Sequence, residues 1–145
     1  MKIVRTALLT AALTVPALLS AQKTVIVPQG QAASATLSPG ARHGDIVFAS
    51  GQLGTSRTDP DSSIQGQTTR ALDKVKAVME AGGSNMANVL KCTVFLVDLK
   101  DFAGMNTAYA GAFPKEPPAR STVVVAALVS PGAKVEIECI GGVAK

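Results

Sequence analysis

The most regular pattern of hydrophobic and polar positions in this chain is that of an amphipathic helix. After a polar loop around residues 58–61, apolar residues recur at the spacing of one helical face. Gly82 and Gly83 follow, at the place where a helix end favours a left-handed residue. The pattern predicts one long helix, whose apolar face consists of Ile64, Ala71, Leu72, Val75, Val78 and Met79.

A second, shorter helix is expected from Asp101 to Phe113. Either Asp98 or Asp101 can cap its first turn, because a carboxylate accepts hydrogen bonds from the free N–H groups there. One side of this helix is expected to carry Phe102, Met105, Tyr109 and Phe113.

Apolar runs between these helices and before them predict strands. An edge strand is expected around Thr24–Val27, a buried strand over Ile46–Gly54 and another over Val89–Val97, with a turn at residues 43–45. Gly51 lies within the second of these runs, where the lack of a side chain lets backbone or a ligand approach closely.

The stretch from Pro117 to Glu138 predicts an antiparallel hairpin. Two runs rich in β-branched residues flank a turn at Ser130, Pro131 and Gly132. The hairpin would bring Arg120, at its entrance, near the returning strand, on which Glu136 and Glu138 share one face. The ordinary explanation of such a pair is a cross-strand ion pair on a solvent-exposed face of the sheet, which contributes ~0.2–1 kcal/mol to the free energy of unfolding.

The predicted elements form a single, mostly antiparallel sheet with two helices on one face, in the α+β class. The other face then needs a cover, because the run from Val123 to Leu128 is apolar on both sides of a strand. Self-association is the cover that we expect.

The first 21 residues have the pattern of a cleaved signal peptide. Lys2 and Arg5 make a basic start, residues 7–19 are almost wholly apolar, and Ser20-Ala21 supply the small residues of a cleavage site. A buried N-terminal helix is the alternative. Residues 22–145 would then form a single mature domain, periplasmic or secreted, with no membrane contact after removal of the signal.

Composition indicates one compact domain and argues against nucleic acid as a partner. The chain has 145 residues, of which 47% are hydrophobic and 17% charged. Without Lys2 and Arg5 its 14 basic residues fall to 12, against 10 acidic ones. With four Phe, one Tyr and no Trp, the chain also lacks stacking platforms for single strands. A ribonuclease is disfavoured because there is no pair of histidines and no basic patch.

The two cysteines, Cys92 and Cys139, fall inside expected strands and are interpreted as buried small residues. Whether they pair stays open. No metal site is expected, because the sequence has no Cys-x-x-Cys, no second histidine beside His43 and no clustered acidic triplet.

Five short motifs, in this order, resemble the YjgF/RidA/UK114 family of reactive-intermediate deaminases. The resemblance covers about residues 36–142. The motifs are Ser50-Gly51-Gln52, the run from Asn88 to Phe102, Asn106 with Tyr109, Pro118-Ala119-Arg120-Ser121, and Val135-Glu136-Ile137-Glu138.

This resemblance implies a chorismate-mutase-like fold that forms a homotrimer, with clefts between subunits. Members hydrolyse enamines and imines such as 2-aminoacrylate, giving 2-keto acids and ammonia, without a metal or cofactor. The expected partner is therefore a small 2-imino acid. The alternative is a non-catalytic module on the same trimer that binds a small carboxylate or another protein.

The resemblance also assigns roles to individual residues. Arg120 matches the arginine that holds the substrate carboxylate, and Glu136 matches the carboxylate that activates the attacking water. Gly51 and Thr122 match positions that line the cleft, and Asn106 and Ser50 are supporting positions.

Two features depart from the family pattern. Leu37 stands where relatives have a tyrosine that closes over the ligand. The segment between Arg120 and Glu136 is one residue longer, which leaves the choice between Glu136 and Glu138 open.

Overall fold

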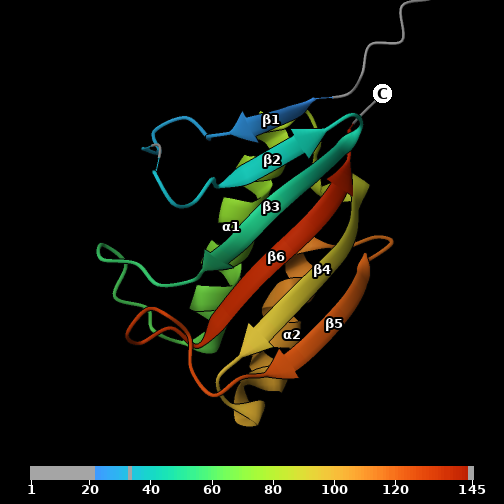
Figure 1. The fold of residues 1–145 in the computed structure, drawn as a ribbon. Coiled ribbons are helices and arrows are strands. Elements are labelled where there is room, and N and C mark those ends of the chain that lie inside the picture. The colour runs from blue at the N-terminus through green and yellow to red at the C-terminus, as the bar shows by residue number, and fades with distance from the viewer. Residues whose placement is uncertain (1–21, 33, 144–145) are drawn as a thin grey trace, which may run out of the picture.

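The fold is a six-stranded sheet with two helices on one face. A computed structural model describes residues 22–32 and 34–143, so the predicted signal peptide lies outside the described residues. The strands pair in the order β1-β2-β3-β6-β4-β5 (Figure 1). Their bounds are β1 Lys23–Ile26, β2 Gly40–His43, β3 Ile46–Leu53, β4 Val89–Leu96, β5 Ala119–Val124 and β6 Val135–Gly142.

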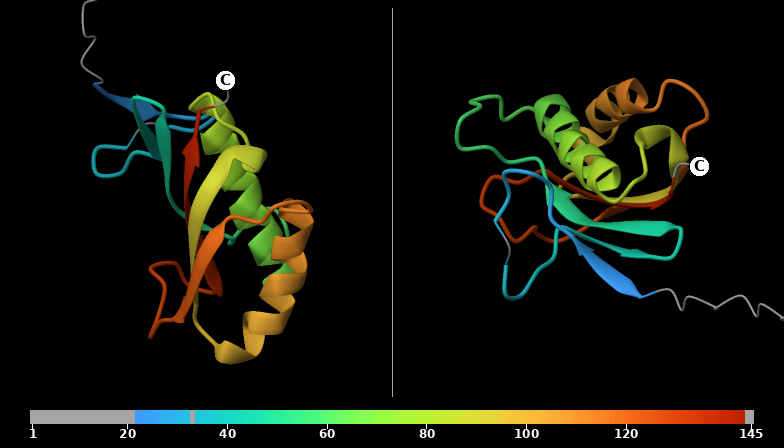
Figure 2. Two further views of the ribbon diagram at one scale, coloured as in Figure 1. Left: turned by 90° about the vertical axis from the view of Figure 1, so that its right-hand side faces the viewer. Right: turned by 90° about the horizontal axis from the view of Figure 1, so that it is seen from above.

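Helices α1 (Ile64–Ala81) and α2 (Phe102–Ala112) both lie on the same side of this sheet (Figure 2). Short 3-10 helices precede β4 and α2, at Met86–Asn88 and Leu99–Asp101. The α+β prediction with two helices on one face is therefore confirmed. Among the described residues, no helix has the length and apolar character needed to cross a membrane.

Helix α1 confirms the sequence pattern at both ends. Ser63 caps it by accepting a hydrogen bond from the Gly66 N–H, and the chain leaves the helix through Gly83 with a φ of +83°. All six residues of its predicted apolar face are buried against the sheet and α2.

Asp98 caps the 3-10 helix Leu99–Asp101 that precedes α2, by accepting a hydrogen bond from the Lys100 N–H, whereas Asp101, which directly precedes α2, makes no side-chain capping bond. Met105, Tyr109 and Phe113 are buried as predicted, whereas Phe102 is 40% exposed.

Strand β2 is an element that the sequence pattern did not predict. It has only four residues, and Pro39-Gly40 precede or begin it, so this stretch has the composition of a loop. Gly40 is needed here, because a Cβ at this position would lie 2.4 Å from Val78 and 2.8 Å from the Phe48 carbonyl. The predicted turn after it is confirmed, with Gly44 at a φ of +57°.

The predicted hairpin between residues 117 and 138 is wrong. Strand β4 lies between β5 and β6, and it pairs with β5 in parallel and with β6 in antiparallel orientation. The physical reason is that β4, α2 and β5 form a crossover unit, which places β5 beside β4. The predicted turn exists, because Ala133 N–H donates to the Ser130 carbonyl at 3.1 Å. It is part of a longer connection, residues 125–134, that reaches past β4.

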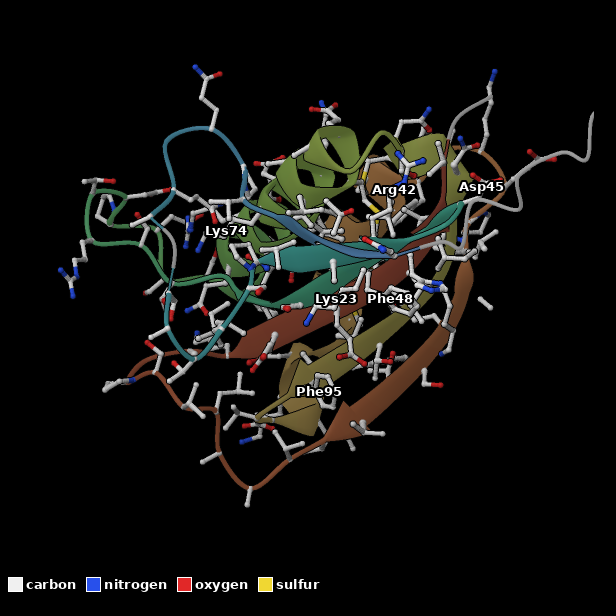
Figure 3. All side chains as sticks on the ribbon, turned by 45° about the horizontal axis from the view of Figure 1, so that its top comes forward. Lys23, Arg42, Asp45, Phe48, Lys74 and Phe95 are labelled. Carbon is white, nitrogen blue, oxygen red and sulfur yellow. A yellow bond between two sulfur atoms is a disulfide. The ribbon has the colours of Figure 1, made fainter. Side chains whose placement is uncertain are left out.

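The face of the sheet without helices, here called the open face, carries apolar side chains. Phe48 and Phe95 lie there with Lys23 (Figure 3), and Val123 and Ile140 are exposed on the same side. This face is uncovered in the single chain.

Cys92 and Cys139 lie directly opposite each other on β4 and β6 and form a disulfide bond. Their Cα atoms are 4.1 Å apart, and the residues are 0% and 1% exposed. The prediction that both are buried is confirmed. The sequence left open whether they pair, and they do, because the register of β4 and β6 places them side by side.

We expect the double variant Cys92→Ala/Cys139→Ala to lose about 4 kcal/mol of free energy of unfolding, because the bond restricts the unfolded chain. The bond joins residues 47 positions apart. Urea unfolding without reductant measures the effect, and wild-type protein unfolded with reductant is the matched control. Equal midpoints for the oxidised protein and the double variant would contradict the prediction.

Candidate functional site

The sheet separates the predicted site residues into two groups on opposite faces. Arg120 on β5 aligns with Cys92 of β4, whose side chain is buried beneath the helices. Glu136 on β6 aligns with Phe95, which lies on the open face. Because aligned residues in a sheet share a face, Arg120 and Glu136 point to opposite sides. The expectation that one turn brings this cation and carboxylate together is therefore wrong within one chain.

The first group lies on the helix side and centres on Arg120. Its guanidinium carbon lies over the Tyr109 ring, 4.6 Å from the ring centroid, and Nη1 is 3.9 Å from the Met105 sulfur. The side chain borders a depression of about 420 Å³. Its lining residues are Asn106, Tyr109, Ala110, Phe113, Pro117, Pro118 and Arg120.

Arg120 forms no ion pair within residues 22–32 and 34–143. The ion pairs of that region are Arg70–Asp59, Lys76–Glu80 and Lys100–Asp98. The ordinary explanation of Arg120, a cross-strand ion pair, is thus not found among the described residues. A guanidinium that has no carboxylate of its own can bind one from outside in two parallel hydrogen bonds.

Thr122 and Asn106 belong to the same side as Arg120. Thr122 aligns with the buried Val94, and its Oγ1 is buried without a hydrogen-bond partner. Asn106 lies one turn before Tyr109 on α2 and lines the depression. The structure thus places three of the predicted site residues on the helix side, and two of them, Arg120 and Asn106, line the same depression.

Tyr109 is a site residue whose role the sequence did not indicate. The helical pattern assigned it to the core face of α2, and it is indeed only 5% exposed. Its hydroxyl is buried without a hydrogen-bond partner. Burial raises the pKa of Tyr109 to about 12, and the nearby charge of Arg120 acts in the opposite direction.

The second group lies on the open face and centres on Glu136. The pairing of β3 with β6 is irregular between Ala49 and Gln52, and Gly51 lies in this irregularity. A Cβ on Gly51 would lie 1.9 Å from Glu136 Oε1. A group does approach Gly51 closely, but it is the side-chain carboxylate of Glu136, whereas the sequence predicted backbone or a ligand.

Ser50 is beside Gly51, and its hydroxyl donates to the Ser38 carbonyl at 2.7 Å. It borders a second depression, of about 390 Å³, together with Leu37, Lys91 and Glu138. Lys91 donates to the Ser121 hydroxyl at 2.7 Å. Glu136 and Glu138 share the open face, so the face alone does not distinguish them, but Glu136 is the one against Gly51.

No three His, Cys, Asp or Glu side chains in the described ranges are grouped so that they could hold a metal ion. The side chains of these two groups supply a guanidinium, an ammonium, two carboxylates, and hydroxyl and amide groups.

Comparison with known proteins gives consistent matches over most of the chain. The sequence model of a family described as Endoribonuclease L-PSP matches residues 28–143. Reactive Intermediate Deaminase A, chloroplastic, from Arabidopsis thaliana is 37% identical over 133 residues, which are 90% of this chain and 71% of that protein.

Two solved structures from E. coli are also similar. The YjgF gene product has a TM-score of 0.75 and 34% identity, over 83% of this chain and 98% of its own. TdcF with bound serine has a TM-score of 0.74 and 32% identity, over 83% of this chain and 99% of its own.

We expect the Tyr109 phenol to titrate near pH 12, against about 10 for an exposed tyrosine, because burial disfavours the phenolate. Tyr109 is the one tyrosine of the sequence and there is no tryptophan, so near-ultraviolet absorbance reports it alone. Since the folded-state pKa is the higher one, the free energy of unfolding should fall as pH rises between these values. The same titration in denaturant is the control. A midpoint near 10 in the folded protein would contradict the burial of this ring.

Proposed function

The chain belongs to the YjgF/RidA/UK114 family, and on this premise we propose that it hydrolyses 2-aminoacrylate and related 2-imino acids to 2-keto acids and ammonia. The observation that carries the proposal is the Arg120 guanidinium, which borders a depression and has no carboxylate partner in the described part of the chain. The name of the Arabidopsis relative supports a deaminase, and the serine bound to TdcF is a ligand with a carboxylate.

Arg120 is the proposed anchor of the substrate. The fork of a guanidinium matches the two oxygens of a carboxylate, which a lysine ammonium cannot match. Thr122 and Asn106, with a hydroxyl and an amide on the same side, are proposed to line the substrate beside this anchor.

Glu136 is the proposed base. Glu136 accepts a proton from water as the oxygen adds to the imine carbon, and passes this proton to the nitrogen, which gives a carbinolamine. Glu136 then transfers the hydroxyl proton to the same nitrogen, the C–N bond breaks to release ammonia, and the C=O of the keto acid remains. An enamine such as 2-aminoacrylate enters this sequence after it tautomerises to its imine. Gly51 supports this role, because its lack of a side chain gives the carboxylate room. Glu138 is the other candidate on the same face.

A site that uses both Arg120 and Glu136 needs more than one copy of the chain, because one sheet holds them on opposite faces. We propose a homotrimer in which the open faces pack together and each cleft takes Arg120 from one subunit and Glu136 from the next. The exposed Phe48, Val123 and Ile140 support association through the open face.

A non-catalytic module that binds a small carboxylate is the second candidate. It is favoured by Leu37, which stands on the rim of the open-face depression where relatives have a tyrosine. It needs Arg120 but not Glu136. Semicarbazide trapping of imines made by an amino-acid oxidase, with and without the purified mature protein, distinguishes binding alone from hydrolysis.

The disulfide supports a periplasmic or secreted protein, because such bonds form and persist in oxidising compartments. On this proposal the imines come from outside the cytoplasm. Because both cysteines are buried, protein recovered from its own compartment is alkylated in denaturant without reductant. It should carry no alkylatable thiol at Cys92 or Cys139, and free thiols there would count against export.

We expect Arg120→Lys to fail almost as badly as Arg120→Ala, because an ammonium keeps the charge but loses the two-pronged geometry. Loss of a charge-assisted bidentate contact costs on the order of 2–4 kcal/mol, or about 30- to 1000-fold in kcat/KM. Glu136→Gln should instead lower kcat while leaving binding of an unreactive 2-keto acid nearly unchanged. Steady-state kinetics and calorimetry measure these effects. Wild-type activity in Arg120→Ala, with the assembly intact, would remove the proposed anchor.

Mixing inactive variants tests the shared cleft. When Arg120→Ala and Glu136→Gln protein are unfolded together and refolded, about a quarter of the clefts in random trimers combine both intact residues. We expect about that fraction of wild-type activity from the mixture and none from either variant refolded alone. Failure of the mixture to regain activity, with mixed trimers present by sedimentation and mass analysis, would show that the site does not span two subunits.

A further inference from the structure

The Tyr109 ring and the Met105 sulfur are the neighbours of the Arg120 guanidinium on α2. The guanidinium carbon is centred 4.6 Å above the Tyr109 ring, within the range of an attractive contact between a cation and an aromatic face. Met105 is on the same side, with its sulfur 3.9 Å from Nη1. Neither neighbour is a carboxylate that would compete with a ligand for the guanidinium.

The ring is itself held in place. Tyr109 packs against Phe113 with the ring centroids 4.8 Å apart, and the two residues are one turn apart on α2. Tyr109 and Met105 are almost completely buried. The ring therefore has little freedom to move away when Arg120 binds or releases a ligand.

We propose that Tyr109 is a positioning residue: its ring seats the Arg120 guanidinium so that the N–H edge stays directed at a bound carboxylate. A guanidinium can stack on an aromatic face and still donate from its edge, because the two contacts use different parts of the group. This inference rests on the proposed role of Arg120 as carboxylate anchor. In this role Tyr109 acts through Arg120 and forms no bond to the carboxylate.

The Tyr109 hydroxyl makes a sharp test possible. It has no hydrogen-bond partner among residues 22–32 and 34–143, so Tyr109→Phe removes no hydrogen bond within that region and keeps the aromatic face. Tyr109→Leu removes that face while keeping an apolar side chain. If the ring positions Arg120, which we call the seat, Tyr109→Phe should preserve ligand binding and Tyr109→Leu should weaken it.

The probe is 2-oxobutanoate, an unreactive 2-keto acid, bound to the full mature protein and measured by calorimetry. We expect Tyr109→Leu to raise Kd about 5- to 30-fold and Tyr109→Phe to stay within about twofold of wild type. In imine hydrolysis, Tyr109→Leu should raise KM with a much smaller effect on kcat, because Glu136 is unchanged. Val75→Ala, a cavity variant in the buried face of α1, controls for lost stability and should bind as wild type does.

A measurement on wild-type protein covers the case in which Tyr109→Leu does not fold. Tyr109 is the one tyrosine and there is no tryptophan, so a near-ultraviolet difference spectrum on adding 2-oxobutanoate reports this ring alone. A carboxylate that pairs with Arg120 changes the field at the ring and should shift its absorbance. Binding without any such shift would overturn the proposal.

The outcomes for the seat and for the deaminase are separate. If the protein hydrolyses imines but Tyr109→Leu binds 2-oxobutanoate as tightly as wild type, the seat is wrong and the deaminase stands. If binding depends on the ring but no imine is hydrolysed, the seat stands and the deaminase is wrong. If wild-type protein does not bind 2-oxobutanoate, Arg120 is no anchor and the seat is overturned.

Discussion

The constraint on which this structure depends is the central position of β4. It pairs with β6 on one side and β5 on the other, and it carries one end of the disulfide. Because residues aligned across a strand share a face, the register of β4 decides which side of the sheet each neighbour faces. Arg120 aligns with Cys92 and therefore lies on the side of the helices, whereas Glu136 aligns with Phe95 and lies on the open face.

This separation changes the meaning of the two charged residues. An arginine beside a glutamate in one chain is most simply a surface ion pair, which contributes little. Here the sheet holds Arg120 and Glu136 on opposite faces, so the two side chains have different surroundings. Arg120 lies on aromatic and sulfur-containing side chains, and Glu136 lies on a glycine that leaves it room. Each group is therefore available for a partner from outside the chain, which is the condition for a cleft shared between subunits.

The spacing of apolar residues and the positions of turn residues predicted those features that depend on neighbouring residues in the sequence. The helical period predicted α1 and its glycine exit but not its capping residue Ser63, and strand composition located β3, β4 and the two C-terminal strands. The pattern missed β2, whose four residues resemble a loop, and it paired β5 with β6 because a Ser-Pro-Gly turn lies between them. Pairing depends on the crossover through α2, a long-range property that turn residues do not encode. The same error placed Arg120 and Glu136 together, and the pattern could not show that the Tyr109 ring lies beneath Arg120 rather than only in the core.

The absence of an acidic neighbour around Arg120 in the described chain is a physical requirement of an anchor. A guanidinium already paired with a carboxylate would have to break that pair before binding another, and the exchange would leave little net affinity. An aromatic seat avoids this cost, because it stabilises the cation through the ring face and leaves the N–H edge to the ligand. The depression beside it is lined largely by apolar residues, including Phe113, Pro117 and Pro118, which strengthens a charge-assisted pair by limiting competition from water. On the proposed role of Arg120, the geometry of one guanidinium selects the ligand on this side, and the contacts of that guanidinium with Tyr109 and Met105 of α2 set its geometry.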